Sequence, residues 1–272
     1  MLLEFICLLC GGGLTATGLL TFWKINYWWD FYRPIVLFIA GYIVGIGLLF
    51  VIEWFAGLFV NKKKEYDHVS KWARFWLMQG TLYIANHALI IVKARGLERV
   101  PRKEKFLLIC NHRSKFDNFV ITNKLGKLDI AFITKRSNAK VPFVKGIIPG
   151  VCYIPIDRDD KMQSLEAFKR ACTLIDTKAT SIGVFPEGTR QQENTVGEFH
   201  EGVFNIAIHS HAPIVVSVIK DSEKVTKRWP FRFTKVKYDV IAVIPYEEYV
   251  GMTAKAISDL TREMMLNHYK ES

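Results

Sequence analysis

Residues 106–117 have the sequence Phe-Leu-Leu-Ile-Cys-Asn-His-Arg-Ser-Lys-Phe-Asp. The first five residues are apolar without a break, and a short run of this kind is typical of a strand that is buried on both faces. His112 and Asp117 follow this run directly. Active-site loops of α/β folds lie at the carboxyl ends of such strands. The segment therefore predicts a buried sheet with His112 and Asp117 at its functional edge.

A second polar cluster follows another apolar run. Residues 181–185 predict a strand, and the chain continues as Pro-Glu-Gly-Thr-Arg over residues 186–190. A guanidinium such as that of Arg190 can bind a phosphate through two parallel hydrogen bonds. Because the loops of one sheet edge lie close together, we expect this cluster to meet the first.

Strand and helix patterns alternate from about residue 90 onwards. A strand followed by a turn is expected over 90–101, and further strands are expected over 106–110, 130–134, 152–156, 181–185, 213–219 and 235–244. Helices are expected over 69–91, from 117, and over 160–177, 202–209 and 253–269. This alternation predicts an α/β domain in which helices flank a mostly buried mixed sheet.

Two apolar segments precede this domain. Residues 5–23 and 34–52 contain no charged residue. A helix of this length spans about 28 Å, which is close to the thickness of the hydrocarbon core of a bilayer. We therefore predict an N-terminal membrane hairpin over residues 1–61, with segments at about 5–23 and 34–60. An interfacial or linking helix would follow over 62–95, and a catalytic domain over 96–272.

The basic residues that follow the second segment predict the orientation. They are Lys62, Lys63, Lys64, Lys71 and Arg74. Basic residues are enriched on the cytoplasmic side of membrane segments. We therefore expect an integral protein of the cell membrane with its catalytic domain on the cytoplasmic face. Two alternatives stay open: the first segment could be a signal peptide, and the hairpin could enter and leave the same leaflet.

Composition limits the classes of partner. Half of the residues are hydrophobic, and 37 basic residues against 26 acidic ones give a net charge of +11. A basic excess favours anionic partners such as lipid headgroups. The sequence has no RNA-binding signature and no Cys/His finger, so we expect membrane lipids and no nucleic acid as partners. Five cysteines do not suggest a disulfide framework, and a reducing compartment is expected.

The polar clusters resemble the motifs of a known family. Residues 111–117 fit the pattern NHxxxxD, and residues 185–190 fit FPEGTR, of the glycerolipid acyltransferases typified by bacterial 1-acyl-sn-glycerol-3-phosphate (lysophosphatidic acid) acyltransferase. Residues 150–158 and 212–218 resemble the middle and last motifs of that family. The order and spacing of the four motifs match over about half of the chain, although the family usually has proline where Val216 stands.

The resemblance implies transfer of a fatty acyl group from acyl-CoA or acyl-carrier protein to the sn-2 hydroxyl of lysophosphatidic acid, which gives phosphatidic acid. No cofactor is then expected, because the acyl donor is a substrate. Histidine suits the removal of the hydroxyl proton because its ordinary pKa is about 6.5. His112 would be this general base, and Asp117 would hold its ring in one tautomer.

The resemblance also implies a site for the acceptor's glycerol phosphate. This substrate-binding site would consist of Arg158, Glu187, Gly188, Thr189 and Arg190. Lys135, at the end of a predicted strand, is a further candidate of the same kind. Alternatively, Arg158 and Glu187 could form a structural ion pair.

Several alternatives to this function stay open. The acceptor could be glycerol-3-phosphate or another lysophospholipid. The protein could also be a hydrolase in which His112 activates water, or a non-catalytic membrane protein that binds lipid. His209 and His211 are expected to mark the end of a helix, and we predict no metal site.

Overall fold

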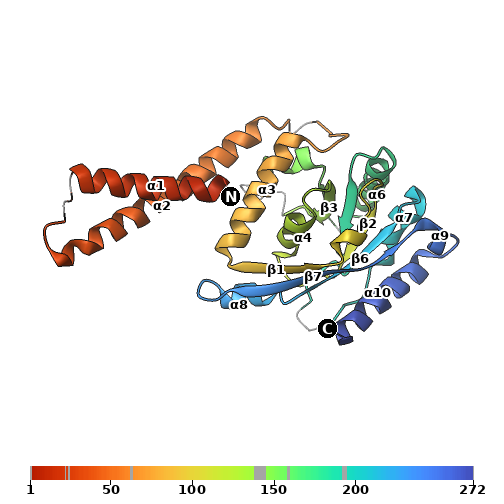
Figure 1. Ribbon diagram of the computed structural model, residues 1–272. Coiled ribbons are helices and arrows are strands. Elements are labelled where there is room, and N and C mark those ends of the chain that lie inside the picture. Colours follow the sequence, from red (N-terminus) through yellow and green to blue (C-terminus); the bar gives the residue numbers. More distant parts are fainter. Residues whose placement is uncertain are drawn as a thin grey trace.

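The computed structural model describes residues 2–21, 23, 25–61, 64–137, 145–157, 160–191 and 195–271. A hairpin of two helices extends from one side of an α/β body (Figure 1). The α-helices are α1 (Leu2–Thr21), α2 (Tyr32–Leu58), α3 (Lys71–His87), α4 (Asp117–Leu125), α6 (Lys161–Asp176), α7 (Asn205–Ser210), α8 (Lys224–Arg228), α9 (Tyr246–Tyr249) and α10 (Ala254–Glu271). The 3-10 helices are η1 (Trp28–Phe31), η2 (Leu97–Arg99), η4 (Ile148–Val151) and η5 (Glu201–Phe204).

Seven strands form one mixed sheet, as the alternating pattern predicted. They are β1 (Ile90–Arg95), β2 (Leu107–Cys110), β3 (Ile130–Lys135), β4 (Ile154–Ile156), β5 (Ser181–Val184), β6 (Ile214–Lys220) and β7 (Thr234–Ile244). Their order in the sheet is β1-β7-β6-β2-β5-β3-β4. Only the β6–β7 pair is antiparallel among these neighbours. The carboxyl ends of β2 to β6 therefore share one edge of the sheet.

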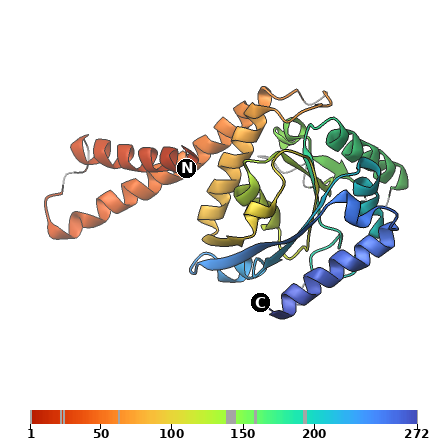
Figure 2. The same cartoon turned by 45° about the vertical axis from the view of Figure 1, so that its right-hand side comes forward.

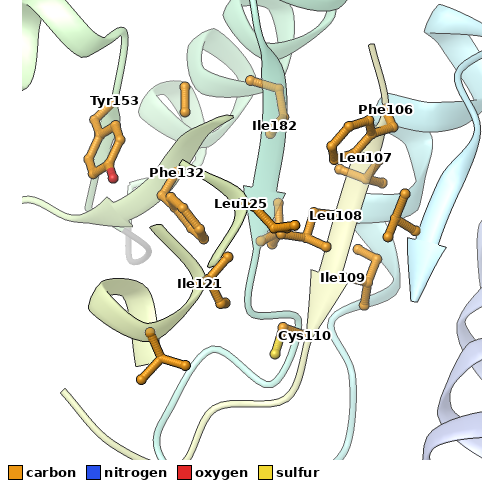
Figure 3. Close-up of a cluster of buried hydrophobic side chains, with 14 of the residues drawn as sticks. Phe106, Leu107, Leu108, Ile109, Cys110, Ile121, Leu125, Phe132, Tyr153 and Ile182 are labelled. Carbon is orange, nitrogen blue, oxygen red and sulfur yellow. The ribbon is translucent and has the colours of Figure 1, made fainter. Parts of the chain in front are cut away.

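The core surrounds the central strands β2, β5 and β6, in which every residue is buried. Ile121 and Leu125 of α4 gather with β2 and with Phe132 of β3 in one apolar cluster (Figure 3). Helices α3 and α4 pack together on one side of the sheet, and α10 lies on the other side (Figure 2). Burial on both sides explains why β2 is continuously apolar.

The two helices of the hairpin pack through small residues. In α2, Gly41 and Gly45 are buried four residues apart, and Gly11 and Gly18 are buried in α1. A Cβ atom on Gly41 would lie 2.5 Å from the carbonyl oxygen of Cys10. Such close backbone approach is typical of helices that associate in a bilayer. Both helices are long and apolar enough to cross a membrane.

Polar contacts join the hairpin to α3. The hydroxyl oxygen of Tyr42 lies 3.0 Å from Glu4 Oε1 and 2.6 Å from His87 Nε2. The indole of Trp72 donates a hydrogen bond to the carbonyl oxygen of Ala56. Helix α3 thus connects the hairpin to the sheet. The segment over 62–95, expected to be an interfacial or linking helix, also contains strand β1, which pairs with β7.

Some element boundaries differ from the predicted ones. The helix expected over 69–91 ends at His87, because Leu89 has a positive φ of 54° and β1 begins at the next residue. The helix expected from residue 202 begins as the 3-10 turn η5. The short helices α8 and α9 were not predicted, since one turn carries too little periodicity to be recognised. Lys62 and Lys63, used to predict the orientation, lie outside the described residues.

Candidate active site

The loop after β2 is held to the neighbouring strand by a side chain. The buried amide of Asn111 accepts a hydrogen bond from the backbone N–H of Ile219 at 2.7 Å and donates one to the carbonyl oxygen of Ile219 at 3.0 Å. The hydroxyl of Tyr269, from α10, donates to the same carbonyl oxygen. Asn111 thereby continues the β2–β6 pairing beyond the end of β2, and the next residue, His112, starts from a fixed position.

His112 and Asp117 form a hydrogen-bonded pair, as their spacing predicted. The distance from His112 Nδ1 to Asp117 Oδ2 is 2.8 Å. The same oxygen accepts the backbone N–H groups of Arg113 and Ser114 at 2.6 and 2.7 Å, and Oδ1 accepts a hydrogen bond from the hydroxyl of Ser222. Because Asp117 acts as the acceptor throughout, Nδ1 of His112 carries the hydrogen and its Nε2 keeps a lone pair.

The loop after β5 packs directly against His112. The ring of Phe185 stacks on the imidazole with centroids 4.4 Å apart and an interplanar angle of 23°. The backbone N–H of Gln191 donates to the carbonyl oxygen of His112 at 2.9 Å. In return, the backbone N–H of His112 donates to Glu187 Oε2 at 3.3 Å. The two polar clusters therefore meet, as expected for loops at one edge of a sheet.

Glu187 is a buried carboxyl group next to this pair, with 4% of its surface exposed. Burial raises the pKa of Glu187 to about 7, and the N–H groups of His112 and Gly197 and the charge of Arg113 oppose this shift. The hydrogen bonds of Glu187 come from these backbone groups, and none to Arg190 occurs among the described residues. Near neutral pH this carboxyl group can therefore change its charge beside His112.

The structure adds residues that sequence reasoning missed. Arg113 is buried and forms an ion pair with Glu223, with Arg113 Nη2 3.2 Å from Glu223 Oε1. Ser222, which binds Asp117, precedes Glu223 in the loop after β6. The signal for these residues was the same as for His112, namely polar residues directly after a buried strand.

The other predicted site residues have different positions. Gly188 is buried and has a positive φ of 72°, a conformation that favours glycine. Thr189 and Arg190 follow it and are exposed. Lys135, the last residue of β3, is also exposed. Arg158 lies outside the described residues. The structure thus brings Glu187 to the His112–Asp117 pair and leaves Thr189, Arg190 and Lys135 on the surface.

The described part of the chain contains no group of three or more His, Cys, Asp or Glu side chains that could hold a metal ion. His209 is the penultimate residue of α7, and His211 follows the helix as its C-cap. This pair therefore marks a helix end, as predicted. The cysteines Cys7, Cys10, Cys110, Cys152 and Cys172 are all free.

Comparison with known proteins identifies the domain that carries this site. The family model named Acyltransferase matches residues 91–220, which include both polar loops. Residues 91–220 belong to the acyltransferase family. The chain is similar to a putative 1-acyl-sn-glycerol-3-phosphate acyltransferase of Caenorhabditis elegans, with 29% identity over 65% of its length. A mouse 1-acyl-sn-glycerol-3-phosphate acyltransferase alpha is 24% identical over 67% of this chain.

The chain spans 48% to 65% of the length of the similar curated proteins, including 63% of the C. elegans protein and 65% of the mouse protein. A solved structure, the 1-acyl-sn-glycerophosphate (LPA) acyltransferase PlsC from Thermotoga maritima, superimposes with a TM-score of 0.62. It is 19% identical, and the match covers 81% of this chain and 86% of that one. This likeness establishes the fold of the acyltransferase domain.

Proposed function

We propose that the protein transfers a fatty acyl group from an acyl thioester to the sn-2 hydroxyl of 1-acyl-glycerol-3-phosphate, which produces phosphatidic acid. The observation that carries this proposal is the imidazole of His112, oriented by the buried Asp117 within an acyltransferase-family domain. The curated relatives named for this reaction support the choice of acceptor. The donor would be acyl-CoA or acyl-carrier protein, and no cofactor takes part.

The reaction needs one proton to move twice. His112 Nε2 would take the proton from the acceptor hydroxyl as its oxygen attacks the thioester carbonyl. The tetrahedral intermediate then loses the thiolate as the carbon–sulfur bond breaks, and the thiolate recovers the proton from His112. Asp117 stabilises the imidazolium that exists between these steps. A positioned base of this kind contributes about 10²- to 10⁴-fold to the rate.

The loop after β5 would bind the acceptor. Arg190 is exposed at the end of the loop that packs on His112 and is available for a phosphate. We assign the same site to Gly188, Thr189 and Arg158, and Lys135 extends it along the sheet edge. Glu187 would help to hold the acceptor site in place, because its carboxyl group accepts a hydrogen bond from the backbone N–H of His112.

The membrane hairpin suits this reaction because the acceptor and the product are lipids. We propose that α1 and α2 span the cell membrane and that the acyltransferase domain lies on the cytoplasmic face, where soluble acyl donors are found. The apolar surfaces that both helices expose support this arrangement.

Transfer of a labelled acyl group by the purified full-length protein tests the proposal. Wild-type protein should convert 1-acyl-glycerol-3-phosphate to phosphatidic acid, with acyl-CoA and acyl-carrier protein tried separately. His112→Ala should lose the activity, whereas the matched variant His209→Ala, altered in α7, should keep it. Circular dichroism verifies that both variants fold.

Other products would contradict the proposal in distinct ways. Free fatty acid would indicate a hydrolase. Product formed only from glycerol-3-phosphate or another lysophospholipid would change the acceptor. Binding of lipid without any product would favour a non-catalytic lipid-binding protein.

A further inference from the structure

The segment between α8 and β7 combines exposed aromatic and basic side chains. Trp229, Phe231 and Phe233 are 56%, 91% and 62% exposed. From Val225 to Lys237 the chain has five basic residues and no acidic residue. All residues over 226–233 are exposed. We call this segment, which includes the last three residues of α8, the aromatic–basic loop. Soluble surfaces rarely expose three large aromatic side chains so close together, and such a patch usually contacts a partner.

This loop is fixed beside the part of the body that holds the membrane hairpin. The indole N–H of Trp229 donates a hydrogen bond to the carbonyl oxygen of His87 at 2.8 Å. The imidazole of His87 contacts Tyr42 of α2, and Glu4 of α1 binds Tyr42. Both views show the loop on the side of the body from which the hairpin extends (Figures 1 and 2). A bilayer that holds the hairpin is therefore near the loop.

The charges of the loop favour an anionic surface. Lys227, Arg228 and Arg232 form no ion pair with any carboxylate of the described residues, and neither does Lys235 just beyond the loop. Basic side chains bind anionic headgroups, while Trp and Phe insert at the boundary between headgroups and acyl chains. A mixture of basic and aromatic residues therefore fits the interface of a membrane better than the surface of a soluble partner.

We propose that the aromatic–basic loop is a second membrane contact that docks on the headgroup region of a bilayer containing anionic lipid. Phe231 and Phe233 enter the interface, and Lys227, Arg228 and Arg232 bind the lipid phosphates. The hairpin and the loop then hold the body at two separate places, which fixes its tilt on the membrane. This contact does not depend on acyl transfer, so its test remains valid if the proposed reaction is wrong.

The test uses the full-length protein in nanodiscs that contain phosphatidylcholine alone or with phosphatidylglycerol. Phe231 is replaced by the photoreactive aromatic p-benzoylphenylalanine, and adducts formed on illumination are identified by mass spectrometry. We expect a lipid adduct at position 231, with a yield that rises with phosphatidylglycerol. The same probe at Val250 is the control, because this exposed residue lies beyond the opposite end of β7 and should give little adduct.

A charge variant tests the role of the basic residues. Lys227→Gln/Arg228→Gln should lower the adduct yield at position 231 severalfold in anionic nanodiscs, because each basic residue near an anionic surface strengthens binding about fivefold. The matched control is Arg102→Gln/Lys103→Gln, an exposed basic pair at the opposite end of β2 from the active site. This control should leave the yield unchanged.

Three outcomes would overturn the proposal. The first is no lipid adduct at position 231. The second is an equal yield at positions 231 and 250. The third is a peptide adduct with added acyl-carrier protein or with a second copy of the chain in place of the lipid adduct, which would assign the loop to a protein partner.

Discussion

At the scale of single residues, the geometry of His112 depends on the groups that surround Asp117. The Asp117 carboxylate accepts two backbone N–H groups and the hydroxyl of Ser222 in addition to His112 Nδ1. The Asp117 carboxylate that accepts these hydrogen bonds is fully buried. Loss of one bond should therefore reduce the precision with which the imidazole is placed.

We therefore expect Ser222 to act as a positioning residue in the proposed reaction. Ser222→Ala should lower kcat about tenfold, because a hydrogen bond to a charged group contributes roughly 1.5–3 kcal/mol. KM for the acceptor should change little, since the side-chain hydroxyl of Ser222 donates its hydrogen bond to Asp117. Steady-state kinetics separates the two constants. Ser258→Ala, a buried serine of α10, is the matched control and should leave both constants unchanged. An equal change in kcat for Ser222→Ala and Ser258→Ala would contradict a positioning role for Ser222.

Glu187 should make stability depend on pH. Its pKa is raised from 4.5 to about 7, so between these values the folded state binds more protons than the unfolded state. Stability therefore falls as the pH rises through this window. The thermal midpoint of Glu187→Gln should fall less steeply with pH than that of the wild type. Glu104→Gln, which removes an exposed carboxylate, is the control. Parallel curves for wild type and Glu187→Gln would contradict the buried, neutral carboxyl group.

The residues that the sequence could predict are those placed by local rules. His112 and Asp117 are five residues apart around the start of a helix, so their contact follows from chain geometry. Glu187 follows a buried strand and was expected at the same edge. Ser222 and Tyr269 reach the site only because β6 lies beside β2 and α10 returns across the sheet. No local pattern contains that information.

At the scale of elements, the hairpin depends on the close approach of its two backbones. Gly41→Val should destabilise the protein by about 1–3 kcal/mol, since a Cβ atom at Gly41 would overlap the backbone of Cys10. Gly47→Val is a matched control in the same helix, because a Cβ atom at Gly47 meets no atom within 4 Å. Thermal unfolding in detergent compares the variants. Equal midpoints would show that the helices are not packed through Gly41.

The helices and strands were largely predictable, because short apolar runs indicate buried strands and apolar residues at helical spacing indicate helices. The order of the strands was not, since pairing between β1 and β7 joins segments far apart in the chain. The start of α6 is fixed by a side chain, because Asp160 accepts the N–H groups of Met162 and Gln163.

At the scale of the whole molecule, the loop after β6 connects the active site to the proposed second membrane contact. Phe231→Ser/Phe233→Ser should therefore raise KM for lysolipid presented in anionic vesicles. KM for a short-chain, monomeric lysolipid should change much less. Val250→Ser is the control for loss of an exposed apolar side chain. An equal rise in KM for both kinds of substrate would place the effect in the active site and remove the link to the membrane.

The pairing of β1 with β7 also affects how the protein is made. Ile90 pairs with Thr234, so more than half of the chain separates the two partners. During synthesis, α1 and α2 leave the ribosome first and can enter the bilayer while β1 still lacks its neighbour. The sheet closes only after β7 has emerged. Until then, the backbone N–H and C=O groups that β1 uses to pair with β7 have no partner in the sheet.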